Sequence, residues 1–308
     1  NKRVKACSVT ACELCRKAYE GIKHTKALRR RRSAFRYEAG AFVQELQGKN
    51  HEIACFRLNC TLTNQCQEHS IKVPEKFYGL IPKEITMKTM YNILEYGADA
   101  SGKELSTPAF TAAIADLAKA GGGTLFVPAG TYYTGPIHFT ANMTLHVDSG
   151  AVLLFSNHKE DFPIVTSRWE GSEETSYSPL LYAKEMDNIA VVGRGTLIGQ
   201  GEAWWKALHA GELAHARPRF IYFERCNNVL IEGVTLLDSP AWTVNPVLCQ
   251  NVTINKLSIK NPWDSPNTDG INPDSCKNVR ISNCQIDVGD DCIAIKSGVE
   301  TCPEFVPC

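Results

Sequence analysis

The chain has 308 residues and carries 33 basic and 33 acidic side chains, so its formal net charge is zero. This length accommodates one large domain and a smaller segment. No stretch is apolar over the length that a membrane span requires, so we expect no membrane partner.

Residues 1–90 differ in charge from the rest of the chain. They hold 18 basic and 8 acidic residues, about +10, whereas the remainder holds 15 and 25, about −10. Such a division suggests two segments of different origin or role. The basic run Arg29–Arg32 is interpreted as solvated charge and not as a nucleic-acid patch, so no nucleic-acid partner is expected. We interpret residues 1–90 as a basic, cysteine-containing extension, non-native or disordered, for example translated sequence upstream of a start near Met87 or Met90.

Cysteine spacing gives no metal signature. Cys12-x-x-Cys15 with His24, and Cys60 and Cys66 with His69, fit no common zinc finger, so neither a metal nor a cofactor is expected. Seven of the 13 cysteines lie at Cys226 or later in the chain. Several of these recur at similar places in the repeat described below, where they are interpreted as small buried hydrophobes in preference to disulfides. No secretory signal is visible before the second segment, which favours a cytoplasmic location, with secretion as the alternative.

A short amphipathic helix is predicted near the start of residues 91–308. Thr107 supplies an N-cap hydroxyl and Pro108 the first helical position, and the pattern ends at the glycines 121–123. Phe110, Ile114 and Leu117 recur at helical spacing. We expect this helix to cover the open first rung of the strands that follow.

A unit consisting of Asn, an aliphatic residue, any residue and another aliphatic recurs along the chain. Its copies begin at Asn142, Asn188, Asn228, Asn251 and Asn278. The last three lie 23 and 27 residues apart, and the earlier gaps of 46 and 40 leave room for two irregular turns each. Alternating aliphatics indicate strands, and Asn tolerates the left-handed backbone of a turn. The repeat predicts an all-β, right-handed parallel β-helix, with an antiparallel sandwich as the alternative.

Three acidic residues are separated by about one such repeat. Asp269 precedes Asp290 and Asp291 by 21 and 22 residues. Neighbouring rungs lie roughly 4.7–4.9 Å apart, so the three carboxyls would crowd together and one pKa would rise. An acid that keeps its proton beside an ionised base is what glycosidic bond cleavage requires.

The motifs around these acids resemble those of glycoside hydrolase family 28, the polygalacturonases. They are Ser239–Trp242, Asn267–Ile271, Gly289–Gly298 and Gly199–Trp205, and the resemblance runs from about Tyr91 to the last residue. It implies inverting hydrolysis of α-1,4 bonds in pectin or oligogalacturonides, without a cofactor and by a monomer. Asp290 matches the general acid, and Asp269 and Asp291 match the pair that holds and deprotonates the attacking water.

Substrate-binding candidates follow from the same motifs. They are Asn267, Lys296 as a contact for a sugar carboxylate, and Trp204 and Trp205 as a stacking surface, with packing as the equal alternative for the two tryptophans. Family members continue to a Gly-His-Gly and an Arg-Ile-Lys motif that this sequence lacks. We therefore expect the 308-residue chain to be an inactive, aggregation-prone fragment.

Two other functions fit a β-helix. One is pectate-lyase-type β-elimination, which usually needs Ca²⁺, and the other is carbohydrate binding without catalysis. The substrate class within pectin stays open. The insert from Phe162 to Pro179, expected to be irregular, is a candidate for the loop that blocks one end of a cleft. The sequence does not separate endo from exo attack, and the lack of a visible signal peptide favours exo-action on imported oligogalacturonides.

Overall fold

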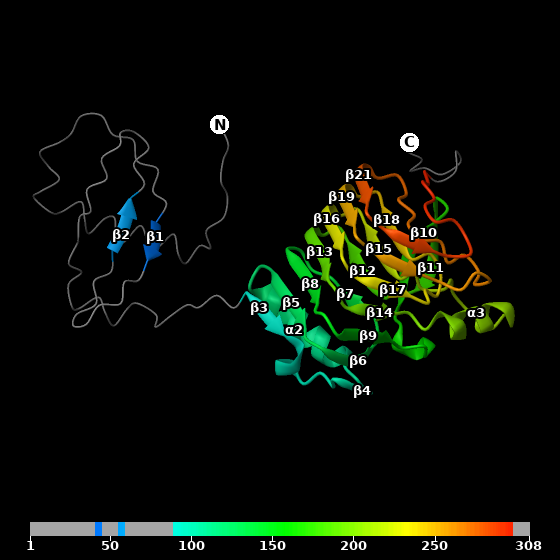
Figure 1. Cartoon of the computed structure of the whole chain (residues 1–308), viewed down its shortest axis with the longest axis horizontal. Helices are drawn as coiled ribbons and strands as arrows, with labels where there is room; N and C mark the ends of the chain where they lie inside the picture. Colours follow the sequence, from blue (N-terminus) through cyan, green and yellow to red (C-terminus); the bar gives the residue numbers. More distant parts are fainter. Residues whose placement is uncertain (1–40, 45–54, 59–88, 298–308) are drawn as a thin grey trace, which may run out of the picture. The chain divides into compact units, whose positions relative to one another are not determined.

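The computed structural model describes residues 41–44, 55–58 and 89–297 of two compact units, Asn1–Ile85 and Thr86–Cys308 (Figure 1). In the first unit the described part is an antiparallel pair, β1 (Ala41–Gln44) and β2 (Cys55–Leu58), with Ala41 opposite Leu58. The zinc candidates and the arginine run of residues 1–90 fall outside the described residues. Among the described helices, none is long and apolar enough to cross a membrane.

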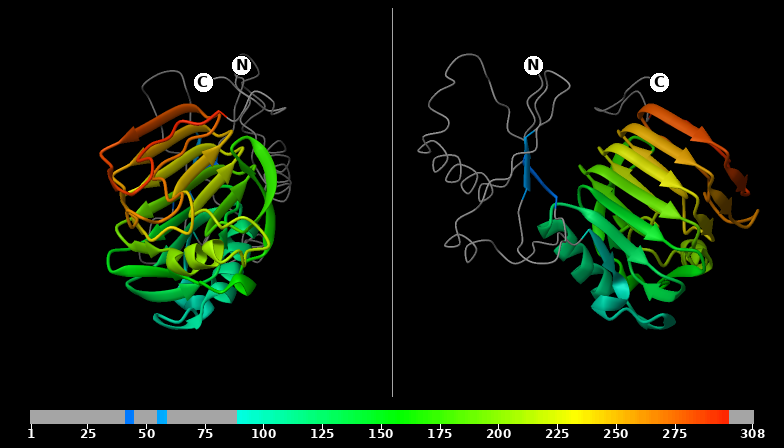
Figure 2. Two further views of the ribbon diagram at one scale, coloured as in Figure 1. Left: turned by 90° about the vertical axis from the view of Figure 1, so that its right-hand side faces the viewer. Right: turned by 60° about the vertical axis from the view of Figure 1, so that its left-hand side comes forward.

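The second unit is a coil of parallel strands stacked in three sheets, the right-handed parallel β-helix that the repeat predicts (Figures 1 and 2). The first sheet contains β3 (Met90–Asn92), β5 (Gly123–Val127), β8 (Met143–Val147), β13 (Asp187–Gly193), β16 (Asn227–Glu232), β19 (Gln250–Asn255) and β21 (Lys277–Ser282). The second contains β4 (Ser101–Leu105), β6 (Gly130–Thr134), β9 (Ala151–Phe155), β14 (Thr196–Ile198), β17 (Thr235–Leu237), β20 (Ser258–Lys260) and β22 (Gln285–Asp287). The third contains β7 (Ile137–His138), β12 (Leu181–Lys184), β15 (Ile221–Glu224) and β18 (Val244–Val247).

Aliphatic side chains on equivalent positions of successive coils form the core. In the first sheet one inward row contains Leu125, Leu145, Val191, Ile231 and Ile254, each paired in register with the next and fully buried. Burying one such side chain contributes roughly 1.5–3 kcal/mol. The alternation of the repeat therefore both orients the strands and sets their register.

The asparagine that opens each repeat occupies a turn in the left-handed region. The backbone φ is between 57° and 59° at Asn142, Asn188, Asn228, Asn251 and Asn278. Their side-chain amides also bond along the stack: Asn188 donates to Asn142 at 2.8 Å, and Asn228 donates to Asn188 at 2.8 Å. The turn role predicted for these asparagines is confirmed, since Asn adopts this conformation with little strain.

The predicted helix is α2 (Thr107–Lys119), and it packs on the first two coils through contacts with β3, β5 and β7. Phe110 and Leu117 on its inner face are buried. The cap assignment was wrong by one residue. Ser106 is the N-cap, and the Thr107 hydroxyl instead accepts a hydrogen bond of 2.6 Å from the Gly135 amide of a neighbouring coil.

Two long gaps in the repeat are each a single coil with an insertion, so the expectation of two irregular turns in each gap is wrong. β13 pairs directly with β8, and β16 pairs directly with β13. The first insertion holds η3 (Lys159–Asp161) and an antiparallel hairpin, β10 (Ile164–Trp169) and β11 (Ser172–Tyr177); the second holds α3 (Gly201–His209).

The hairpin corrects the expectation of an irregular insert between Phe162 and Pro179. Its turn places Glu170 at φ 48° and Gly171 at φ 89°. Two consecutive positive φ values are typical of the tight turns that join antiparallel strands. Polar, alternating residues here form a strand pair outside the repeat instead of another coil.

Candidate active site

The third sheet continues beyond β18 through isolated bridges, and these bring the acidic motifs onto adjacent coils. Val244 bridges Ile271, and Ile271 bridges Ile293. Asp269 and Asp291 each lie two residues before a bridge residue, and the Gly270 amide donates a hydrogen bond of 2.9 Å to the Asp291 carbonyl. The two acids therefore occupy equivalent positions one coil apart.

Glycine permits this close approach of the two coils. A Cβ on Gly270 would lie 2.5 Å from the Cys292 carbonyl oxygen, and one on Gly289 would collide with the Trp263 carbonyl oxygen. Because real Cβ atoms do not come this close, any side chain at either position would separate the coils. The glycines next to the acids are thus required by packing.

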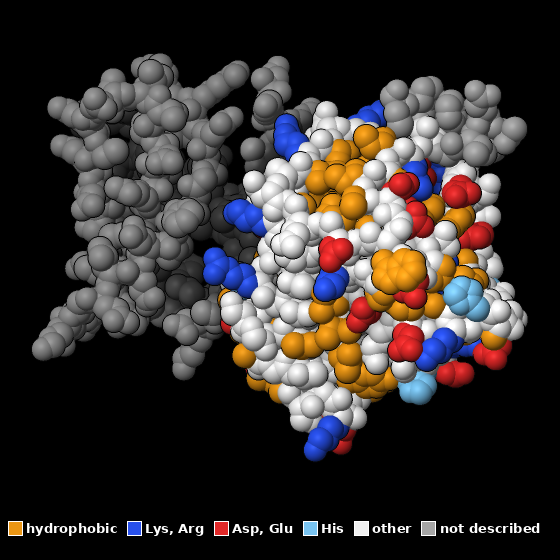
Figure 3. Space-filling model, turned by 45° about the vertical axis from the view of Figure 1, so that its right-hand side comes forward, with side chains coloured by type: hydrophobic (Ala, Val, Ile, Leu, Met, Phe, Trp, Pro, Cys, Tyr) orange, Lys and Arg blue, Asp and Glu red, His pale blue; other side chains and the backbone are white. Residues whose placement is uncertain are grey.

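The carboxyl groups of Asp269, Asp290 and Asp291 form one cluster, as the spacing predicts. One oxygen from each lies within 4.8 Å of the others. Asp269 is 3 % exposed, whereas Asp290 and Asp291 are exposed. Figure 3 shows acidic side chains gathered with some basic and hydrophobic ones on one face of the second unit.

Asp269 has two different oxygens. Oδ2 accepts a hydrogen bond of 2.8 Å from the side-chain amide of Asn272 and lies 3.8 Å from Nζ of Lys296. Oδ1 is buried and has no hydrogen-bond partner among the described residues. Burial raises the pKa of Asp269, and the charge of Asp290 adds to the rise, while the Asn272 bond and Lys296 oppose it.

Crowding of the acids predicts a raised pKa for the general acid, whereas the structure raises the pKa of Asp269, which the family resemblance assigns to the water-activating pair, mainly because this carboxyl is buried. Three carboxylates are a compact donor set for a cation, but the Lys296 ammonium already supplies a positive charge beside Asp269. A buried carboxyl with one free oxygen is suited to accept a proton from a water held at that oxygen.

Lys296 lies on the coil after Asp269 and is close to an aromatic ring. Its Nζ is 4.4 Å from the centroid of the Trp242 ring. Trp242 belongs to the Ser239–Trp242 motif and occupies the coil before Asp269, since the Thr243 amide donates a hydrogen bond of 2.9 Å to the Asp269 carbonyl. The structure therefore brings the lysine predicted to contact a sugar carboxylate to the acid cluster.

Asn267 is exposed at the turn that leads into Asp269, with φ 52°. Its Oδ1 accepts a hydrogen bond of 2.8 Å from Nη2 of Arg217. Nη1 of Arg217 also donates to the carbonyls of Pro240 at 2.9 Å and Pro266 at 2.7 Å. Burial lowers the pKa of Arg217 to about 10. Arg217 thus ties the Ser239–Trp242 motif to the turn before Asp269, a role that no sequence motif indicated.

The two tryptophans of α3 differ in exposure. Trp204 is 1 % exposed, and its ring contacts Phe162 at 5.1 Å and Tyr177 at 5.2 Å between centroids. Sugar stacking on Trp204 is therefore wrong, because no face of the ring is accessible. Trp205 is half-buried, and its indole N–H donates to the Ser239 carbonyl at 3.1 Å.

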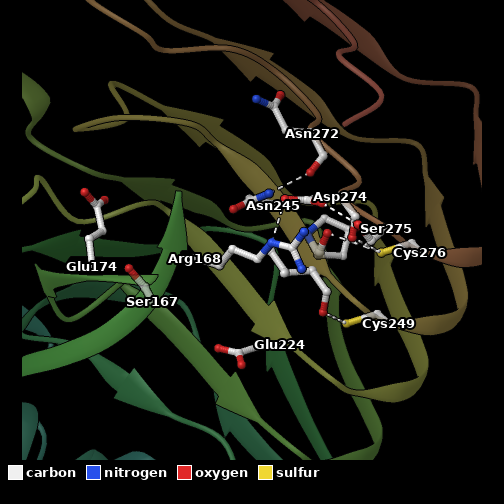
Figure 4. Close-up of polar contacts among 12 residues, drawn as sticks. Ser167, Arg168, Glu174, Glu224, Asn245, Cys249, Asn272, Asp274, Ser275 and Cys276 are labelled. Atoms are coloured by element: carbon white, nitrogen blue, oxygen red, sulfur yellow. Dashed lines mark hydrogen bonds and ion pairs between the residues drawn. The ribbon is translucent and has the colours of Figure 1, made fainter. Parts of the chain in front are cut away.

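A buried polar cluster connects the hairpin to the third sheet and its continuation (Figure 4). Nη1 of Arg219 donates to Oδ1 of Asn245 at 3.0 Å, and the Asn245 amide donates to the Asn272 carbonyl at 2.7 Å. Nε of Arg168 lies 3.6 Å from Oδ2 of Asp274. The cluster connects the hairpin to Asn272, the residue that orients Asp269. Sequence reasoning missed these residues because they come from three separate coils and the insert.

The β-helix has counterparts among known proteins. The family model of glycosyl hydrolases family 28 matches residues 121–303, more than half of the chain. The chain belongs to this family.

Relatives in family 28 include plant and bacterial proteins. A probable polygalacturonase of Vitis vinifera is 38 % identical over 216 residues, which is 67 % of this chain and 44 % of that protein. An exopolygalacturonase of Zea mays is 29 % identical over 240 residues, 76 % of this chain and 55 % of that protein. The chain thus spans about half the length of the curated relatives it matches.

Solved structures of polygalacturonases resemble the second unit of this chain. A hyperthermoactive exopolygalacturonase from Thermotoga maritima matches with a TM-score of 0.63 and 36 % identity, covering 68 % of this chain and 55 % of that one. A polygalacturonase from Erwinia carotovora matches with a TM-score of 0.55 and 25 % identity, covering 63 % and 56 %. Both support the β-helix and the family assignment.

Proposed function

We propose that the protein hydrolyses α-1,4 bonds between galacturonosyl units of a pectic chain, by acid/base catalysis at Asp269, Asp290 and Asp291. The observation that carries this proposal is the cluster of three carboxylates on two adjacent coils, with Lys296 beside it. The names of the family 28 relatives, polygalacturonase and exopolygalacturonase, support the substrate class.

The proposed division of labour uses the difference in burial. Exposed Asp290 protonates the leaving oxygen, because an acid for the glycosidic oxygen must be reached by the sugar. Buried Asp269 and neighbouring Asp291 hold and deprotonate the water, with the free Oδ1 of Asp269 as an acceptor. Lys296 offsets part of the repulsion between the acids and the polyanionic substrate.

We further propose exo-action, in which the enzyme attacks the pectic chain from one end. The β10–β11 hairpin packs beside the coil that carries the Ser239–Trp242 motif, since Trp169 stacks on Trp242 with 4.0 Å between ring centroids. A hairpin standing next to the acids is suited to closing one end of a substrate groove. Similarity to the Thermotoga maritima exopolygalacturonase supports this choice.

The test compares the release of reducing sugar from polygalacturonate with ultraviolet absorbance of the products. It uses the 308-residue chain and a chimera continued by the C-terminal coils of the Thermotoga maritima exopolygalacturonase. From the chimera we expect new reducing ends without an absorbing unsaturated sugar, and monomeric galacturonate as the first product.

Three outcomes would contradict the proposal in different ways. An absorbing product means β-elimination. Binding of polygalacturonate without turnover in both proteins means a carbohydrate-binding β-helix. Full turnover in Asp290→Asn means that catalysis occurs elsewhere, and turnover by the 308-residue chain alone would make the expectation of inactivity wrong.

A further inference from the structure

Two indole rings from different parts of the chain stack beside the acids. Trp169 ends strand β10 of the inserted hairpin, and Trp242 lies on the coil before Asp269. Their ring centroids are 4.0 Å apart and the planes differ by 12°. Trp242 is 2 % exposed, whereas Trp169 is half-buried. Trp169 therefore covers Trp242 with a side chain that the repeat itself does not supply.

Trp242 in turn contacts the cation of the site. Nζ of Lys296 lies 4.4 Å from the Trp242 ring centroid and 3.8 Å from Oδ2 of Asp269. An ammonium over an indole ring is attracted by the ring electrons. Since a lysine side chain has many rotamers, a fixed ring is what keeps its ammonium at one place.

The hairpin is anchored well enough to hold Trp169 in place. The Arg168 amide donates to the Tyr222 hydroxyl at 2.9 Å, and the Arg168 guanidinium lies 3.6 Å from Asp274. Arg219 donates to the Arg168 carbonyl, and its Cζ lies 5.2 Å from the Trp169 ring and 5.7 Å from the Trp242 ring.

We propose that Trp169 is a positioning residue: by stacking on Trp242 it holds the Lys296 ammonium beside Asp269, and so couples the inserted hairpin to the acid cluster. Its consequence for turnover rests on the proposed function, but the coupling itself does not. The other charges that face this place are Asp290 and Asp291 from the next coil, and Arg219 with Glu174, whose side chains lie 4.0 Å apart.

The coupling is tested first by nuclear magnetic resonance on the 308-residue chain. The ε-methylene protons of Lys296 should show an upfield ring-current shift from Trp242, assigned with Lys296→Met. In Trp169→Leu we expect this signal to move toward its random-coil position, and in Trp169→Phe to move part of the way. Ile164→Ala, an exposed residue of the same strand, is the matched control and should leave it unchanged.

A mutant cycle on the chimera then separates positioning from simple loss of structure. Trp169→Leu should lower kcat about fivefold, the size expected for losing one cation–π contact. It should also raise the pKa that governs the acid limb of the pH–rate profile, because the ammonium that favours ionised Asp269 is no longer held. In a Lys296→Met background the same substitution should change neither quantity further.

The outcomes separate this proposal from the proposed function. An unchanged Lys296 signal in folded Trp169→Leu overturns the positioning role, as does an equal kcat loss in the Lys296→Met background. If Trp169→Leu does not fold, an unchanged signal in Trp169→Phe overturns it. If the chimera without substitutions cleaves no polygalacturonate, the proposed function fails, while the Lys296 signal still decides the coupling.

Discussion

The side-chain amide of Asn272 donates a hydrogen bond of 2.8 Å to Oδ2 of Asp269, and no described residue donates one to Oδ1. Asn272 is itself held, because its carbonyl accepts a bond of 2.7 Å from the amide of Asn245. The buried carboxylate is thus oriented by one oxygen, while the other, itself buried, is left without a partner among the described residues. This asymmetry is what a group that binds and deprotonates a water needs.

Removing this anchor should shift the pH dependence of turnover. In Asn272→Ala the ionised form of Asp269 loses a hydrogen bond, so its pKa rises further and the acid limb of the pH–rate profile moves to higher pH. A bond to a charged group is worth about 1.5–3 kcal/mol, so kcat/KM should fall at least roughly tenfold. The matched control is Asn278→Ala, an exposed turn asparagine; an identical acid limb in both variants would refute this role.

Neutralising Asp269 should stabilise the fold at neutral pH. Burial raises the folded-state pKa of this carboxyl above its unfolded value, so the folded state favours the protonated form. Its contribution is therefore favourable below the unfolded pKa and is lost as pH rises through the folded pKa.

Asp269→Asn removes that cost and should raise Tm at pH 7 by roughly 2–4 °C for a difference of about 1 kcal/mol. The gain should shrink as the pH falls below the unfolded pKa. Calorimetry at pH 7 and at a pH below the unfolded pKa measures this gain in Tm. Exposed Asp287→Asn is the control. A lower Tm for Asp269→Asn at pH 7 would mean that the ion pair with Lys296 outweighs burial.

Arg217 should matter for both stability and turnover. Its three hydrogen bonds, at 2.7–2.9 Å, fix the turn before Asp269. Arg217→Leu leaves the buried Pro240 carbonyl and the half-buried Pro266 carbonyl without their donor, which should cost about 2–4 kcal/mol of unfolding free energy. Arg280→Leu, exposed on β21, is the control and should lie within about 0.5 kcal/mol of wild type.

Arg217 variants separate the loss of stability from the loss of turnover. We expect Arg217→Lys to recover part of the stability but not the bidentate geometry, because a lysine ammonium does not replace a planar guanidinium. Denaturant titration and steady-state kinetics on the chimera measure both. Wild-type kcat in a folded Arg217→Leu variant would show that the turn does not position Asp269.

Trp204 should behave as a core residue. Trp204→Leu leaves a cavity between Phe162 and Tyr177 and should cost about 3 kcal/mol of stability, with KM for polygalacturonate unchanged. Exposed Trp263→Leu provides a comparison of equal size at the surface and should leave the unfolding free energy close to wild type. A raised KM without loss of stability in Trp204→Leu would instead support sugar stacking on Trp204.

The anomeric form of the first product tests the stereochemistry that the family resemblance implies. Inverting pairs generally keep their carboxyl groups about 6.5–9.5 Å apart, and here the nearest oxygens of the three acids lie within 4.8 Å. We still expect inversion, because the third carboxylate holds a water instead of attacking the sugar. Proton resonance of early products should show the β-anomer; the α-anomer first would indicate retention through a covalent intermediate.

Much of the architecture could be predicted from local pattern. The asparagine at the start of each repeat and the alternating aliphatics predict both the strand positions and the turns. This works because each coil repeats the same turn and strand conformations. The gaps of 46 and 40 residues were misread, since an insertion and an extra coil consume similar lengths of chain. Only the direct pairing of β8 with β13 and of β13 with β16 shows that each gap holds an insertion and not an extra coil.

The sequence by itself determined the family, the coil and the convergence of Asp269, Asp290 and Asp291, because spacing along a periodic coil converts directly into proximity. Only the tertiary structure decided which acid is buried, that Asn272 and Arg217 orient it, that Trp204 is core, and that the hairpin brings Trp169 to Trp242. These contacts join segments with no common period. Their distance in space is set by how the insertions pack on the third sheet, and no repeat in the sequence encodes it.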